Sequence, residues 1–163
     1  MSPRLPRRSR RGLGEQAPPA RGRRVRGCRE VRGDRGKRLV GRYYLEVVAG
    51  RRIDVLQQLV APEFVGHDPA GAIMDRAGYF DAVAMLHEAF AQLVVSIDDQ
   101  VAERDRVTTR WCAVGTHIGT FMGIAPTGRN VILTGIDIHR IEGGRLVELW
   151  EQLDLAHLLA QML

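Results

Sequence analysis

The sequence contains few of the residues on which several protein classes depend. It has two cysteines in 163 residues, so a disulfide framework is excluded and a reducing, cytoplasmic location is expected. No run approaches the roughly 18 apolar residues of a membrane span, so no membrane partner is expected.

Several catalytic motifs are also absent. The chain has three serines and no Gly-x-Ser-x-Gly turn, which argues against a serine hydrolase. No His-Glu-x-x-His or paired Cys-x-x-Cys spacing occurs, so no metal site is predicted. Gly119, Gly123 and Gly128 lie in a predicted hairpin instead of between a strand and a helix, so they do not form a phosphate-binding loop.

Charge is distributed unevenly along the chain. The net charge of +5 arises from residues 1–38, which are rich in Arg, Gly and Pro, whereas residues 39–163 are net acidic. This composition predicts a basic, disordered tail followed by one folded domain. An acidic domain argues against a nucleic-acid-binding surface on residues 39–163. Nucleic acid is therefore an expected partner only if the basic tail of residues 1–38 is part of the protein.

Three interpretations of residues 1–38 remain open. They could lie upstream of the natural start, since codons for Arg, Gly, Pro and Ala are rich in G and C; we favour this interpretation. They could form an arm that binds nucleic acid or acidic membrane through charge. Arg7-Arg8 and Arg10-Arg11 are similar to the twin arginines of an export signal, but no apolar run follows them.

Within residues 39–163 the hydrophobic period changes from 3.6 to 2. Asp75 and Asp154 are predicted helix N-caps, and residues 142–145 a tight hairpin turn. Helices in one run and strands in another indicate an α+β fold with a pocket at the open end of a curved sheet. The predicted helices cover 39–50, 53–60, 75–93 and 154–162, and the predicted strands 64–67, 95–101, 107–118, 131–141 and 146–153.

Four stretches of the chain carry motifs of a known family. They are RLVGRYYLEVVAG (38–50), LVAPEFVGHDP (59–69), GTHIGTFMGIAPTGRNV (115–131) and GIDIHRIEGGRLVELWEQLD (135–154). These residues resemble the SnoaL-like polyketide cyclase (ester cyclase) family of the nuclear transport factor 2-like superfamily. The resemblance implies a cone-shaped antiparallel sheet wrapped on three helices, a cystatin-like α+β barrel. It also implies a homodimer and aldol cyclisation of a hydrophobic carbonyl substrate without metal or cofactor.

Two acids, Asp137 and Glu151, are the predicted catalytic residues. Asp137 lies between two isoleucines, where a carboxylate is costly without a role or a partner. If the last two strands pair through the Gly143-Gly144 turn, Asp137 and Glu151 become near neighbours, and repulsion in a closed pocket would keep a proton on one of them. Such a pair suits aldol chemistry, because one carboxylate removes a proton beside a carbonyl while an acid protonates the developing alkoxide.

The resemblance implies a specific role for Glu151. In the resembling cyclases, the residue after the strand Trp is an Asp that acts as general acid/base; here Glu151, one methylene longer, follows Trp150. Those cyclases tend to have His where this chain has Asp137 and Leu149, so its site is predicted to be more apolar. Structural alternatives remain: Glu151 as a surface ion-pair partner, and Asp137 as a buried acid bonded to backbone or to Arg140.

The other predicted site residues are substrate-binding. His117 lies in the family-specific run, with a hydrogen bond to a loop carbonyl as its alternative. His67 precedes Asp68-Pro69 and could instead be a turn residue. His87, His139 and His157 give no strong signal. The predicted substrate-binding residues are Tyr43, Tyr44, His67, Trp111, His117, Phe121 and Leu149.

Three functional hypotheses follow. The first is a cyclase or isomerase that uses Glu151 and Asp137. The second is a non-catalytic small-molecule-binding or accessory module with the same pocket. The third is another enzyme on this fold, such as a hydratase or dehydratase, because one fold hosts many reactions.

Overall fold

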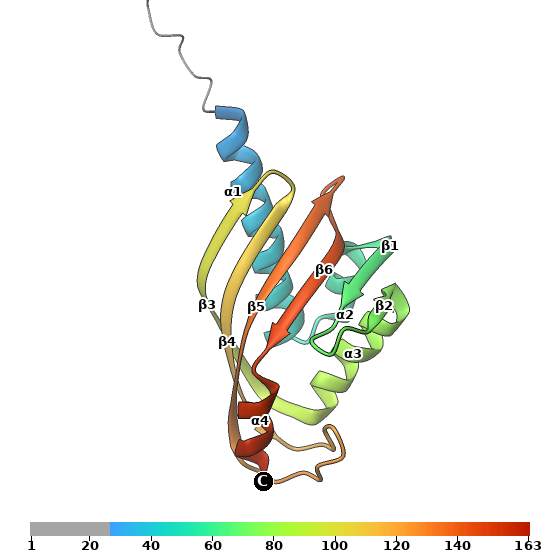
Figure 1. Cartoon of the computed structure of the whole chain (residues 1–163), viewed down its shortest axis with the longest axis vertical. Helices are drawn as coiled ribbons and strands as arrows, with labels where there is room; N and C mark the ends of the chain where they lie inside the picture. Colours follow the sequence, from blue (N-terminus) through green and yellow to red (C-terminus); the bar gives the residue numbers. More distant parts are fainter. Residues whose placement is uncertain (1–26) are drawn as a thin grey trace, which may run out of the picture.

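The computed structural model describes the chain from Gly27 to Leu163, and its side chains from Gly33 onward (Figure 1). The predictions made for residues 1–26 of the basic tail lie outside the described residues.

Helix α1 (Gly27–Arg42) begins inside the segment that composition predicted to be disordered. Tertiary packing accounts for a helix in this segment. Gly36 is buried, and a Cβ atom on it would lie 3.0 Å from Val107 Cγ2 and 3.2 Å from Ile141 Cδ1. The missing side chain lets α1 lie directly on the sheet, and such packing stabilises a helix more than its own propensity does.

A π-helix, η1 (Tyr43–Ala49), continues α1 and ends at Gly50. His87 holds its end, because Nε2 donates to the carbonyl oxygens of Val47 at 3.0 Å and Val48 at 3.2 Å. A π-helix has a wider turn than an α-helix and is frequent at functional sites. It turns two successive tyrosines and two valines into the core: Tyr43, Tyr44, Val47 and Val48.

Three further helices follow: α2 (Ile53–Leu59), α3 (Arg76–Ala89) and α4 (Leu155–Met162). Both predicted N-caps are confirmed. The backbone N–H of Gly78 donates to Asp75 at 2.9 Å, and that of His157 donates to Asp154 at 3.1 Å. From Gly27 to Leu163, no helix is both long and apolar enough to cross a membrane.

The sheet has six strands in the order β2-β1-β6-β5-β4-β3. β1 runs parallel to β6, and the other neighbours are antiparallel. The sheet is therefore mixed, because β1 runs parallel to β6 where an antiparallel sheet was expected. The strands are β1 (Val60–His67), β2 (Ile73–Asp75), β3 (Phe90–Glu103), β4 (Arg106–His117), β5 (Asn130–Glu142) and β6 (Arg145–Leu153).

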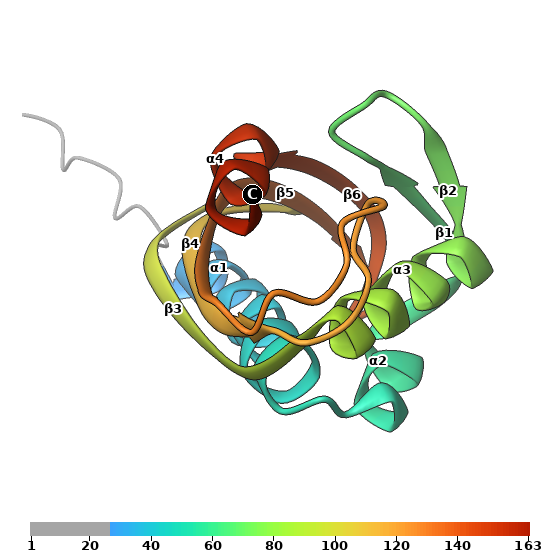
Figure 2. The same ribbon diagram turned by 90° about the horizontal axis from the view of Figure 1, so that it is seen from below.

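The strands from β3 to β6 curve around the core, as the end-on view shows (Figure 2). α4 and the loop between β4 and β5 lie at the end of the sheet that faces the viewer. Alternate residues of β4 point inward and are all buried, from Val107 to His117. The predicted α+β fold is confirmed, and its concave face carries the candidate site.

Candidate functional site

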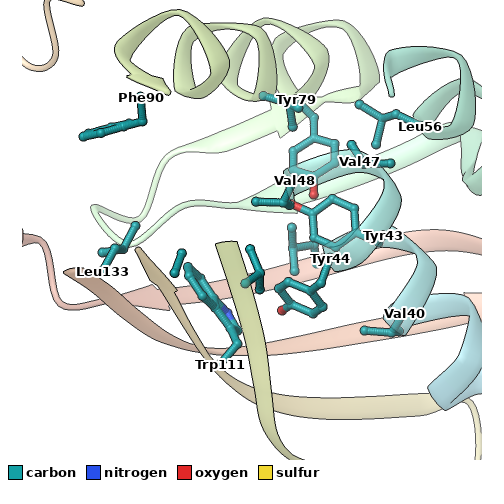
Figure 3. Close-up of a cluster of buried hydrophobic side chains, with 14 of the residues drawn as sticks. Val40, Tyr43, Tyr44, Val47, Val48, Leu56, Tyr79, Phe90, Trp111 and Leu133 are labelled. Carbon is teal, nitrogen blue, oxygen red and sulfur yellow. The ribbon is translucent and has the colours of Figure 1, made fainter. Parts of the chain in front are cut away.

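Asp137 accepts two side-chain hydrogen bonds on one oxygen. The Tyr44 hydroxyl donates to Oδ2 at 2.5 Å, and the Trp111 indole Nε1 donates to the same atom at 2.7 Å. Figure 3 shows the hydroxyl of Tyr44 and the indole nitrogen of Trp111 pointing toward the same place. The π-helix η1 and strand β4 thus supply donors to a carboxylate on β5.

Gly135 makes this position of the Trp111 indole available. Gly135 lies opposite Trp111 in the β4–β5 ladder, and a Cβ atom on it would lie 2.7 Å from Trp111 Cζ2. Real Cβ atoms essentially never come so close, so any side chain here would move the indole. The backbone of β5 therefore helps to aim Trp111 Nε1 at Asp137.

The second oxygen of Asp137, Oδ1, is buried and has no hydrogen-bond partner among the described residues. Burial raises the pKa of Asp137 to about 6, against the opposing effect of hydrogen bonds from Tyr44, Trp111 and the backbone of Gln152. Two donors therefore fix one oxygen, while the other keeps its lone pairs available for proton transfer.

Glu151 lies directly opposite Asp137 in the β5–β6 ladder, so the two acids are the near neighbours that the sequence predicted. A register shift between Arg140 and Ile141 produces this pairing. Burial, and then the nearby charges of Asp137 and Asp68, raise the pKa of Glu151 to about 8. In the described part of the chain, no salt bridge joins either acid to a basic side chain. Burial and mutual repulsion therefore favour the retention of a proton by the pair near neutral pH.

His139 lies beside the acid pair, although the sequence analysis did not select it. It is fully buried two positions after Asp137 on β5, and neither ring nitrogen has a hydrogen-bond partner among the described residues. Its ring centroid lies 5.4 Å from that of Tyr43 and 6.0 Å from that of Tyr44. Burial lowers the pKa of His139 to about 3, so the imidazole is neutral. Strand parity, which placed it on the face of Asp137, was the available signal.

Four of the predicted substrate-binding residues also lie in or beside the core. Leu149 is fully buried opposite His139, and the hydroxyls of Tyr43 and Tyr79 face each other (Figure 3). His117 is fully buried, and its Nδ1 lies 3.1 Å from the Thr127 hydroxyl. The ring of Phe121 meets that of Phe90 edge-on at 5.0 Å.

His67 does not join this group. Its Nε2 donates to Glu148 Oε1 at 3.0 Å, and its ring stacks on Trp150 with centroids 5.3 Å apart. Both partners alternate along β6 with the inward-facing Leu149 and Glu151, so His67 lies on the outer face of the sheet. The parallel pairing of β1 with β6 sets this register, which places His67 opposite Trp150.

An apolar cavity of about 30 Å³ adjoins the Trp111 indole. Its walls come from η1, α3, α4 and strands β3 to β5, and no polar side chain lines it. The lining residues are Val48, Leu86, Phe90, Leu93, Trp111, Ala113, Gly115, Val131, Leu133 and Leu158.

A larger, open hollow of about 600 Å³ lies beside β4 and β5. Its lining combines the outward-facing Arg110, Thr134 and Ile136 with the inward-facing Trp111 and Gly135. Neither acid of the pair lines this hollow. Across residues 27–163, no group of three or more His, Cys, Asp and Glu side chains could hold a metal ion.

Comparisons with known proteins agree with this architecture. The profile of the SnoaL-like polyketide cyclase family matches residues 38–162. The structure is similar to wild-type IdmH, a candidate polyketide cyclase from Streptomyces antibioticus, with a TM-score of 0.68 and 30% identity over 78% of this chain and 97% of that one.

Two further structures extend the comparison. TsrD from Streptomyces laurentii gives a TM-score of 0.70 and 26% identity over 79% of this chain and 95% of its own. AclR, a candidate hydroxylase from Streptomyces galilaeus, gives a TM-score of 0.74 and 24% identity over 80% of this chain and 82% of its own. At this identity the likeness shows the fold alone. No curated protein matches the chain significantly.

Proposed function

The chain belongs to the SnoaL-like polyketide cyclase family, and from this premise we propose that it cyclises or isomerises a hydrophobic carbonyl substrate by acid/base chemistry. The observation that supports this most is the pair of facing carboxyl groups, Asp137 and Glu151, with pKa values raised to about 6 and about 8. Pairs of titratable groups whose pKa values differ within one pocket are typical of acid/base catalysis.

The proposed reaction begins with proton abstraction by Asp137. Its free Oδ1 takes a proton from the carbon next to a carbonyl, and the resulting enolate carbon bonds to a second carbonyl carbon of the same molecule. The proton of Glu151 passes to the oxygen of that second carbonyl, which becomes a hydroxyl. The proton on Asp137 then returns to Glu151, whose higher pKa favours this direction.

The deuterium exchange of 2-tetralone in D₂O, followed by NMR, tests the first step. Asp137→Asn should slow exchange beside the carbonyl by about 10²- to 10⁴-fold, because a positioned base contributes that much. Glu151→Gln should slow exchange less and abolish ring closure of substrates with two carbonyls. The rate should follow a bell-shaped pH profile whose two limbs lie near the pKa values of the pair, about 6 and about 8.

Glu148→Gln is the matched control, since Glu148 lies on the same strand with its side chain on the outer face. It should exchange like the wild type. Wild-type rates in both Asp137→Asn and Glu151→Gln would remove the acid/base assignment.

A non-catalytic binding module is the second candidate. Leu149 favours it, because this fully buried side chain faces the neutral His139 and cannot transfer a proton. Binding of 2-tetralone by the wild type without exchange above the buffer rate would favour this candidate over the enzyme.

We also propose a homodimer formed through the outer face of β3 to β5. That face exposes four large apolar side chains, and an isologous pairing would cover them on both copies. Light scattering should give about twice the chain mass of 18.2 kDa, and Ile136→Lys should halve the measured mass. A wild-type mass of one chain at all concentrations would reject the dimer. The four exposed side chains are Val94, Val114, Ile132 and Ile136.

A further inference from the structure

The apolar cavity beside Trp111 is too small for a substrate in the closed structure. Its volume of about 30 Å³ exceeds that of a single water site only slightly, whereas ligand pockets usually measure roughly 300–1,000 Å³. One of its walls must therefore move before a ligand with several carbons can enter.

α4 is the wall whose polar attachments are exposed, while Leu158 and Met162 anchor it in the core. The other lining residues belong to η1, α3 and three strands of the sheet, and the strands are joined by hydrogen-bonded ladders. α4 is the last helix, is eight residues long, and contributes one lining residue, Leu158. In Figures 1 and 2, α4 covers the end of the sheet at which the β4–β5 loop also lies.

Gln161 attaches α4 to the edge of β5. Its Oε1 accepts from the N–H of Ile132 and its Nε2 donates to the carbonyl of Ile132, both at 2.8 Å. This edge is available because the pairing of β6 with β5 begins only at Gly135. Arg129 Nη1 also donates to the Gln161 carbonyl, at 3.2 Å. These bonds are exposed, so water can replace them when the helix leaves.

The turn before α4 provides a fixed pivot. The backbone N–H of Asp154 donates to the Thr134 carbonyl at 3.0 Å, and its side chain caps the helix. Movement of α4 about this turn would withdraw Leu158 from the cavity while β6, which carries Glu151, stays paired to β5.

We propose that α4 is a lid over the substrate cavity and that Leu158 determines the length of the apolar group that fits behind Trp111. The ligand class is a ketone with a linear or cyclic apolar group. This inference rests on the proposed function only in taking this cavity as the place of the substrate, so its test measures binding and not turnover.

The probes are straight-chain 2-alkanones with six to twelve carbons, and the signal is Trp111 fluorescence. The background is Trp150→Phe, which removes the other tryptophan, on the outer face. Leu158→Ala deletes three carbons from the cavity wall and should move the tightest-binding ketone to a chain two or three carbons longer. Each added carbon should strengthen binding about four-fold, as expected for one buried methylene.

Gln161→Ala tests the lid separately. It should leave the preferred chain length unchanged and raise the association rate several-fold in stopped-flow measurements, because it removes the attachment but not the wall. Leu163→Ala is the matched control, since Leu163 is 83% exposed at the end of the same helix. It should change neither quantity.

The proposal is overturned if Leu158→Ala keeps the wild-type chain length, or if Gln161→Ala binds no faster than Leu163→Ala. If circular dichroism shows that Leu158→Ala does not fold, Leu158→Val replaces it. This variant deletes one carbon and should lengthen the tightest-binding ketone by one carbon. Repeating the series in Asp137→Asn separates the two proposals: a shifted optimum there supports the lid even if catalysis by the acid pair is rejected.

Discussion

The two faces of strands β5 and β6 hold carboxyl groups in opposite ways. On the inner face Asp137 and Glu151 lie opposite each other, and burial raises both pKa values. On the outer face Glu148 accepts from Arg140 Nε at 2.8 Å and from His67 at 3.0 Å. Burial acts to raise the pKa of Glu148, but these hydrogen bonds outweigh it and the pKa is lowered.

The contrast shows what distinguishes a reactive acid from a structural one on the same strands. Glu148 has the partners that a buried charge requires, so it stays ionised and contributes modestly to stability. Asp137 and Glu151 have each other, and repulsion between them favours a shared proton. Carboxyl pairs with raised pKa values cluster at functional sites, which supports the proposal that the inner face carries the active site.

The largest effect expected from this contrast is on the pH dependence of stability. Because the folded pKa values of Asp137 and Glu151 lie above the ordinary value of about 4, their contribution is complete below pH 4. It is lost as pH rises through about 6 and about 8. The free energy of unfolding, measured with urea, should therefore fall by a few kcal/mol between pH 4 and pH 9.

Glu151→Gln and Glu148→Gln should separate the two faces. Glu151→Gln should remove most of the decrease in the free energy of unfolding between pH 4 and pH 9, because an amide does not ionise. Glu148→Gln should leave this pH dependence unchanged and cost less than about 1 kcal/mol at neutral pH, because its ion pair is only partly buried. An equal slope in the wild type and Glu151→Gln would show that the inner pair does not carry raised pKa values.

The facing position of Asp137 and Glu151 could be predicted because it is local. The Gly143-Gly144 turn brings β5 and β6 together, and a period of 2 then decides which side chains share a face. The register shift between Arg140 and Ile141, which sets Glu151 directly opposite Asp137, has no such local signal. The helix caps at Asp75 and Asp154 were predictable for the same reason, since each uses a backbone N–H within three residues.

The remaining features depend on contacts between distant segments. The parallel pairing of β1 with β6 has no sequence signal, and it places His67 on the outer face against Trp150. The early start of α1 depends on the space that Gly36 leaves beside β4 and β5. The convergence of Tyr44 and Trp111 on one oxygen of Asp137 requires the turn of a π-helix, which no periodicity predicted.

A smaller effect tests how the inner face fixes the charge on Asp137. Tyr44→Phe removes the donor that lies 2.5 Å from Oδ2, while Tyr43→Phe removes the neighbouring hydroxyl on the same π-helix. Hydrogen bonds to a charged group contribute about 1.5–3 kcal/mol, and one pKa unit corresponds to about 1.4 kcal/mol. Tyr44→Phe should therefore raise the pKa of Asp137 by about one unit or more, measured from its carboxyl carbon by NMR.

Tyr43→Phe should leave the pKa of Asp137 nearly unchanged, because its hydroxyl faces Tyr79 instead (Figure 3). The acid limb of the pH–rate profile should move upward with the NMR value in Tyr44→Phe and stay in place in Tyr43→Phe. Equal shifts in the two variants would mean that the general polarity of the pocket, and not the bond from Tyr44, holds the charge on Asp137. The inner face would then tune its acids by burial alone, and the contrast with Glu148 would reduce to a difference in solvent exposure.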